Sequence, residues 1–242
     1  MTKLADRDRM PVLAACALHA GYGDAPVVRG LDLTVHAGEV VALLGANGAG
    51  KTTTILTLAG ALRPLGGRVE WLGGPAGPTL AHRSRAGLGL VPEERSIFTR
   101  LSVAENLSIG RGPADRALEL FPELRPHLRR RAGLLSGGQQ QMLTVARALA
   151  ARPRALLIDE LSLGLAPVIT RRLLDAVRAA AADGVAVLLV EQHVRQALAV
   201  SDRAYVLSRG SLVLQGPSAE LAADITAIER SYLSLPETKG RS

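Results

Sequence analysis

The sequence predicts an α/β fold with a mixed sheet at its core, and two patterns carry most of this prediction. Residues 39–44 form an apolar strand that runs into a glycine-rich loop, and a helical segment over 53–62 follows it. Residues 155–158 and 185–190 are apolar enough for buried strands, with a helical segment over 169–181 between them. Alternation of strand, helix and strand is typical of a parallel sheet.

A third pattern adds an antiparallel β subdomain at the start of the chain. Residues 12–18 and 27–35 are expected to form strands, and a glycine-containing turn separates them. Apolar residues alternate with polar ones at Leu31, Leu33 and Val35. This period of two indicates a strand with one buried face.

The loop after the strand 39–44 fits the phosphate-binding pattern GxxxxGK[ST] over residues 45–52. Its glycines allow backbone N–H groups to converge on a phosphate, and the helix that follows points its positive end at the same place. Lys51 is expected to reach the outer phosphates, and the Thr52 hydroxyl to bind Mg²⁺. The residues expected to contact the nucleotide here are Gly45, Asn47, Gly48, Gly50, Lys51, Thr52 and Thr53.

The middle of the chain is predicted to be helical. Residues 63–67 contain a proline and two glycines and should end the first helix, 68–72 should form a short strand, and 73–78 a loop. From about 93 to 151 the pattern is helical. A late hairpin is expected from strands at 205–208 and 212–215.

Two further motifs identify the family that the chain resembles. Residues 135–141 read Leu-Ser-Gly-Gly-Gln-Gln-Gln and open a helix whose apolar stripe includes Met142 and Val145. Residues 155–160 form an apolar strand that ends in Asp159 and Glu160. In this order, after a phosphate loop, the motifs resemble the LSGGQ and Walker B motifs of ABC-type ATPases, a branch of the P-loop NTPases. The resemblance covers about residues 12–221.

That resemblance implies ATP and Mg²⁺ as cofactors and gives roles to several residues. Asp159 would hold the magnesium shell, and Glu160 would orient or deprotonate the attacking water. Tyr22, in a chain with only 2% aromatic residues, would stack on adenine. The family works as a head-to-tail pair, so its signature residues would contact ATP held by the other subunit; here they are Ser136, Gly137 and Gly138.

Three departures from the common pattern resemble one branch of the family, the F-type ATPase subunits of branched-chain amino acid importers. Glu93 stands where a glutamine is usual, and residues 161–167 read Leu-Ser-Leu-Gly-Leu-Ala-Pro. Gln192 aligns with the switch position that normally holds histidine, and His193 lies one residue beyond. The resemblance makes Gln192 the expected switch, and His193 is a less suitable substitute because neighbouring residues of an extended segment point to opposite sides. His193 stays the alternative. Leu161 departs even from this branch and could shift Glu160.

The resemblance also sets the expected organisation and partners. We expect one domain over 1–242, with a core lobe and β subdomain over about 12–92 and 152–221 and a helical subdomain over about 93–151. No apolar stretch approaches the roughly 18 residues of a membrane helix. The expected location is therefore the cytoplasmic face of the cell membrane, bound peripherally. The implied partners are membrane subunits, a second ATPase subunit (the same or a sister chain) and, indirectly, an extracytoplasmic solute-binding protein.

The composition of the chain helps to decide between the alternative partners and functions. The net charge of +7 permits nucleic acid, membrane surfaces and acidic partners, but the scarcity of aromatics argues against a nucleic-acid partner. The basic run at 125–131 favours a solvated face over a lipid or partner contact. The nearest rival function is a urea or short-chain amide importer ATPase. An ABC ATPase of DNA repair or translation and a degenerate nucleotide-binding regulator are the remaining alternatives.

Overall fold

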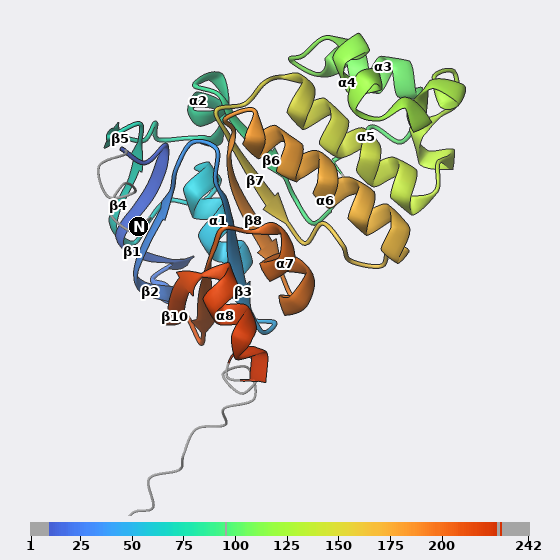
Figure 1. Cartoon of the computed structure of the whole chain (residues 1–242). Helices are drawn as coiled ribbons and strands as arrows, with labels where there is room; N and C mark the ends of the chain where they lie inside the picture. Colours follow the sequence, from blue (N-terminus) through green and yellow to red (C-terminus); the bar gives the residue numbers. More distant parts are fainter. Residues whose placement is uncertain (1–9, 95, 227, 229–242) are drawn as a thin grey trace, which may run out of the picture.

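The fold is built around a six-stranded mixed sheet, seen in the computed structural model, which describes residues 10–94, 96–226 and 228 (Figure 1). The strand order is β10-β9-β3-β8-β7-β6; β10 pairs antiparallel with β9, and the other neighbours pair in parallel. The strands are β3 (Val40–Gly45), β6 (Leu88–Val91), β7 (Ala155–Asp159), β8 (Ala186–Glu191), β9 (Arg203–Ser208) and β10 (Ser211–Pro217). The predicted mixed sheet is confirmed.

A second, antiparallel sheet of four strands lies beside the first and has the order β2-β1-β4-β5. Its strands are β1 (Leu13–Tyr22), β2 (Ala25–Val35), β4 (Gly66–Trp71) and β5 (Gly74–Pro75). The alternating residues Leu31, Leu33 and Val35 are all buried. The period of two therefore marked the face that packs on the core, as expected.

Helices cover both faces of the mixed sheet (Figure 1). Helix α1 lies between the two sheets, while α5 and α6 lie side by side on the opposite face. The α-helices are α1 (Lys51–Ala59), α2 (Leu80–Arg85), α3 (Val103–Ile109), α4 (Ala114–Leu120), α5 (Gly137–Ala150), α6 (Pro167–Ala182), α7 (Val194–Val200) and α8 (Ser218–Ala223). Short 3₁₀ helices η1 (Pro122–His127) and η2 (Ala132–Leu134) precede α5.

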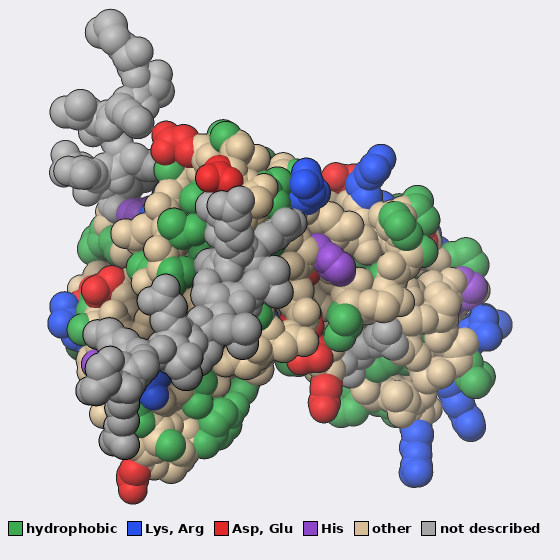
Figure 2. All heavy atoms as spheres, turned by 90° about the horizontal axis from the view of Figure 1, so that it is seen from below, with side chains coloured by type: hydrophobic (Ala, Val, Ile, Leu, Met, Phe, Trp, Pro, Cys, Tyr) green, Lys and Arg blue, Asp and Glu red, His purple; other side chains and the backbone are tan. Residues whose placement is uncertain are grey.

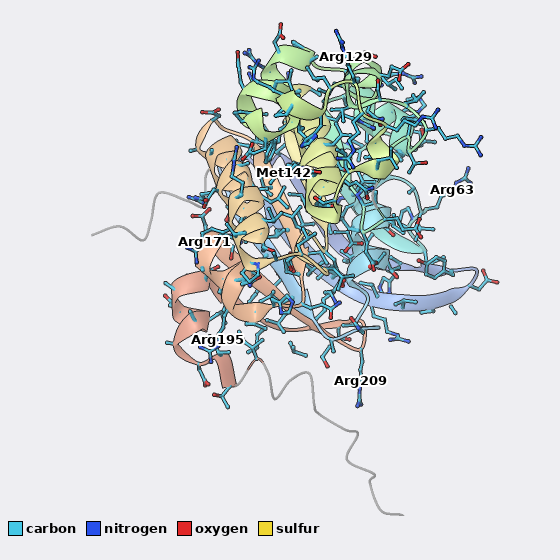
Figure 3. The ribbon with its side chains drawn as sticks, turned by 90° about the vertical axis from the view of Figure 1, so that its right-hand side faces the viewer. Arg63, Arg129, Met142, Arg171, Arg195 and Arg209 are labelled. Atoms are coloured by element: carbon cyan, nitrogen blue, oxygen red, sulfur yellow. The ribbon has the colours of Figure 1, made fainter. Side chains whose placement is uncertain are left out.

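The core follows the alternation of the central strands. In β8, Leu188 and Val190 pack with α1 and the antiparallel sheet, whereas Val187 and Leu189 pack with α5 and α6. Met142 of α5 is buried in this second core, and Figure 3 shows its position within the helical layer. A strand with both faces covered reads as a continuous apolar run, and this explains why residues 185–190 were recognisable in the sequence.

The main differences from the sequence predictions concern boundaries and short elements. The helix predicted at 53–62 begins at Lys51 and ends at Ala59, because Gly60 adopts a left-handed φ of 82° and closes the helix. The elements β6, α2, α7 and α8 were not predicted from the sequence, and the two-residue strand β5 lies within the segment 73–78 that was predicted to be a loop. No helix in the described part of the chain is long and apolar enough to cross a membrane. The division into a core lobe and a helical subdomain stays a prediction.

Candidate nucleotide-binding site

The candidate site lies where three neighbouring parallel strands end. In the sheet, β8 runs between β3 and β7, and its register pairs Glu191 with Leu44 on one side and Val190 with Asp159 on the other. The phosphate loop follows β3, so it emerges beside the ends of the other two strands. Ligands of open α/β sheets bind at the carboxyl ends of the strands. The segments that the sequence predicts to form the nucleotide site therefore meet at one edge of the sheet.

A cavity of about 420 Å³ opens at this edge. Most of its lining belongs to the predicted nucleotide site: Asn47, Gly48, Gly50, Lys51, Thr52, Thr53, Glu93, Glu160 and Gln192. Two further lining residues, Val27 and Leu163, were missed because they are ordinary apolar residues of a strand and of a loop. Only the spatial arrangement brings them to the cavity.

The phosphate loop has the backbone conformation that its glycines permit. Gly48 and Gly50 have φ values of 78° and 103°, a region that favours glycine. A Cβ at Gly50 would also lie 2.8 Å from a methyl carbon of Val28. No side chain caps the N-terminus of α1. Its first N–H groups therefore stay available for an anion.

Lys51 and Glu160 face each other inside the cavity. The Lys51 Nζ atom donates to the carbonyl oxygens of Gly45 at 2.8 Å and Ala46 at 3.2 Å, and lies 3.9 Å from Glu160 Oε1. Burial lowers the pKa of Lys51, and the Glu160 carboxylate is the nearest charge that opposes this effect. Lys51 thus contacts carbonyl groups of the phosphate loop in this structure. To reach a bound phosphate, its ammonium group would have to leave these contacts.

Asp159, at the end of β7, has the properties of a cation ligand. Its side chain is 2% exposed, and its Oδ1 atom has no hydrogen-bond partner in the described structure. Burial raises the pKa of Asp159 to about 6, and a hydrogen bond from Thr52 partly opposes that rise. Buried polar atoms without partners are rare. A carboxylate and a hydroxyl are oxygen ligands that Mg²⁺ accepts alongside phosphate oxygens, so these two residues fit the ion.

Gln192, and not His193, faces the cavity. The Gln192 Nε2 atom donates to Glu160 Oε1 at 2.6 Å. His193 is exposed, does not line the cavity and stands at the N-cap of α7. This placement agrees with the alternation argument, although the catalytic role of Gln192 stays a prediction.

We therefore expect ATP turnover to depend on Gln192 and to be nearly indifferent to His193. Replacing Gln192 with alanine removes the hydrogen bond to Glu160 and should lower kcat about tenfold, the effect of roughly 1.4 kcal/mol. The Gln192→His variant keeps a donor and should match or exceed the wild-type rate. His193→Ala is the matched control, and phosphate release in the presence of the membrane partner is the measurement. A collapse of turnover in His193→Ala with ATP binding intact would reverse the assignment.

The remaining predicted residues lie outside this cavity or at its edge. Tyr22 ends β1 and is 56% exposed, so it is free to stack and is no core residue. Glu93 is an exposed lining residue. Ser136 caps α5: its Oγ accepts from Gln139 N, and its own N–H donates to Gln139 Oε1. Ser136, Gly137 and Gly138 do not line the cavity of their own chain.

The surface beside the site is basic over the helical layer. Figure 2 views the end of the molecule that lies at the bottom of Figure 1, and its blue side chains project mainly on the side where α3 to α5 lie. In Figure 3, Arg129 from the basic run 125–131 lies at the outer end of this layer. Arg125, Arg129, Arg130 and Arg131 are all exposed. These arginines are accessible in the single chain, and the choice between a solvated face and a lipid or partner contact stays a prediction.

Comparison with known proteins finds relatives that are ATP-binding proteins of transport systems. A family model described as "ABC transporter" matches residues 28–162. The chain is 41% identical, over 83% of its length and 90% of the relative, to the "High-affinity branched-chain amino acid transport ATP-binding protein BraG" of Pseudomonas aeruginosa. It is 34% identical to a "Probable branched-chain amino acid transport ATP-binding protein LivF" of Archaeoglobus fulgidus, over 87% of this chain and 94% of that protein. It is also 38% identical to the "Lipopolysaccharide export system ATP-binding protein LptB" of Escherichia coli, over 93% of this chain and 98% of that protein.

Solved structures share the fold. One described as "Structure of ATP binding subunit of ABC transporter" has a TM-score of 0.78 and 26% identity, and the match covers 92% of this chain and 98% of that one. A nucleotide-free ATP-binding cassette from an ABC transporter has a TM-score of 0.84 at 23% identity, over 93% of this chain and 100% of that one. At that identity the second likeness concerns the fold alone.

Proposed function

This chain belongs to the ABC transporter family of ATP-binding subunits, and from that membership we propose how its residues bind and hydrolyse ATP to energise a transporter. The observation that carries the proposal is the meeting of Lys51, Glu160 and Gln192 in one cavity beside the phosphate loop. Phosphoryl transfer needs a phosphate cradle, a cation and a positioned water. All three requirements have candidate residues at this edge of the sheet.

The binding step would use the loop and the first turn of α1. Their N–H groups would surround the outer phosphates, because the left-handed glycines turn the backbone inward and no side chain caps the helix. The ammonium of Lys51 would move from the carbonyls of Gly45 and Ala46 to the phosphate oxygens. Thr52 and Asp159 would hold Mg²⁺, which supplies neutralisation of the phosphate charge.

The hydrolysis step would use Glu160 as the base for the attacking water. Its carboxylate is nearly buried, at 9% exposure, and lies 3.9 Å from the Lys51 ammonium. Gln192 orients this carboxylate through its amide N–H. An amide carries no charge, so this switch stabilises developing charge less than a protonated histidine would. A slow basal rate at this site is the expected consequence.

We propose that a second ATPase subunit completes the site. Ser136, Gly137 and Gly138 begin the 14-residue helix α5, whose N-terminus is suited to an anion, yet they lie outside the cavity of their own chain. A nucleotide held by another subunit is the partner that this arrangement fits. The membrane subunits would hold the pair at the cytoplasmic face of the membrane, with a solute-binding protein on the other side.

The proposed cargo is branched-chain amino acids. Support comes from the functions that the BraG and LivF relatives are named for. Further support comes from the branch markers, which are Glu93, the segment 161–167 and the pair Glu191 and Gln192. Lipopolysaccharide export is the second candidate, because the LptB relative matches almost the whole chain. Urea or short-chain amide import remains the third.

Gene deletion distinguishes these cargoes. We expect a deletion strain to lose uptake of leucine, isoleucine or valine at low external concentration, and a plasmid copy of the gene to restore it. A plasmid copy with Glu160→Gln is the control and should not restore uptake. Normal amino acid uptake combined with lost urea uptake would support the amide importer instead. Normal uptake combined with defective lipopolysaccharide at the cell surface would support the export function.

A further inference from the structure

A buried pair of hydrogen bonds joins the loop after Glu160 to the end of β8. Ser162 donates its backbone N–H to Glu191 Oε1 at 3.1 Å and its hydroxyl to Glu191 Oε2 at 2.8 Å. Ser162 is 6% exposed and Glu191 is 2% exposed. Neither residue lines the nucleotide cavity. They therefore belong to the layer of residues behind the site.

Burying the carboxyl group of Glu191 at this position costs free energy of folding. None of the ion pairs between described residues includes it. Burial raises the pKa of its carboxyl group, and the hydrogen bonds from Ser162 oppose that rise. A well-packed apolar residue generally serves stability at least as well as a buried charge. Stability alone thus gives no reason for a polar, hydrogen-bonding side chain here.

The position of the pair gives a better reason. Ser162 lies two residues after Glu160, and Glu191 directly precedes Gln192. Gln192 Nε2 in turn donates to Glu160 Oε1 at 2.6 Å, and the Glu160 N–H donates to Val190 O at 3.0 Å. These hydrogen bonds close a ring through the loop and the strand end. The ring fixes Glu160, the candidate base, and Gln192, the candidate switch, relative to each other.

The backbone of Glu160 needs such support. Its φ is 48°, a left-handed conformation that costs energy for a residue with a side chain. Residues in such conformations persist only where their surroundings hold them. The segment on one side of Glu160 is strand β7, and on the other side Ser162 is the first residue with side-chain hydrogen bonds to a buried partner. The Ser162–Glu191 pair is thus the anchor on the loop side.

We propose that Ser162 and Glu191 are positioning residues for ATP hydrolysis, which hold Glu160 and Gln192 in the orientation that hydrolysis requires. This inference rests on the proposed function, since it assigns the pair to the same reaction. The pair acts by hydrogen bonding and not by charge. A glutamine at 191 can accept from the Ser162 N–H and donate to the Ser162 hydroxyl, which then acts as the acceptor. Both hydrogen bonds thus survive in Glu191→Gln.

The test compares three variants by phosphate release, equilibrium binding of a fluorescent ATP analogue and thermal melting of the full chain. Ser162→Ala should lower kcat about tenfold, the equivalent of one lost hydrogen bond of roughly 1.4 kcal/mol, with ATP affinity unchanged. Glu191→Gln should keep kcat near the wild-type value. Ser162→Cys, nearly the same size but a weak donor, should fall between them and serves if Ser162→Ala does not fold.

Ser218→Ala is the matched control for stability. The Ser218 hydroxyl is also buried and hydrogen-bonded, at 2.7 Å from Ser201 Oγ, but it lies in α8 away from the cavity lining. It should lower the melting temperature as Ser162→Ala does, and leave kcat unchanged. Equal kcat values in the two alanine variants would overturn the positioning role. Absence of ATP hydrolysis in the wild-type protein would instead overturn the proposed function, so the two failures are distinguishable.

Discussion

Replacing Glu160 with glutamine is expected to lower ATP turnover by about 10²- to 10⁴-fold, the usual contribution of a positioned general base. Glutamine has nearly the same shape, and its amide oxygen can still accept from Gln192 Nε2, which lies 2.6 Å from the present carboxylate oxygen. The amide does not accept the proton of the attacking water. ATP binding should therefore persist while hydrolysis stops. Phosphate release and equilibrium nucleotide binding measure the two steps separately.

The control for this prediction is Glu119→Gln, which removes an exposed carboxylate from helix α4 and should leave both measurements unchanged. Because bound ATP is not consumed in Glu160→Gln, this variant should also accumulate a closed pair of ATPase subunits. If Glu160→Gln releases phosphate at the wild-type rate, another residue is the base and the mechanism must be reassigned.

The second large effect is expected from Lys51→Ala, which should abolish detectable ATP binding. Lys51 is 4% exposed and lines the cavity, where its charge is weakly screened. Losing a charge-assisted contact of about 3 kcal/mol corresponds to a loss of roughly 100-fold in affinity. Losing the bonds to Gly45 and Ala46 also loosens the loop itself. Both effects act in the same direction.

Binding of a fluorescent ATP analogue measures this loss, and a thermal melt shows whether the variant remains folded. Glu160→Gln provides the comparison, because it changes the opposite partner of the 3.9 Å contact and retains the lysine. A folded Lys51→Ala protein with wild-type ATP affinity would exclude the assigned phosphate site.

The sequence was informative where local chemistry decides the structure. The phosphate loop was recognisable because Gly48 and Gly50 need backbone angles that other residues rarely adopt. The strands β3, β7 and β8 were recognisable because both of their faces are buried. By contrast, α7 has only seven residues, too few to show a helical period, and β6 contains a glycine within only four residues. Short elements of this kind are decided by tertiary packing.

In the candidate site, too, some features follow from the local sequence and others depend on tertiary packing. The family resemblance aligned Gln192 with the switch position, and alternation along an extended segment argued against His193 as its substitute. The hydrogen bond between Gln192 and Glu160, and the pair formed by Ser162 and Glu191, depend on the parallel register that sets Asp159 beside Val190. A single sequence contains no information on that register. Likewise, Val27 and Leu163 reach the cavity only because distant strands converge there.

Pairing under turnover is the most direct test of the claim that a second subunit completes the site. Where the second subunit is another copy of this chain, light scattering on the purified Glu160→Gln chain, with and without ATP, should show the mass double only when ATP is bound. Ser136→Arg in the same background places a large charged side chain at the start of α5 and should leave ATP binding nearly intact but prevent the doubling. A wild-type chain that hydrolyses ATP at full rate while its mass stays that of one chain would contradict this account.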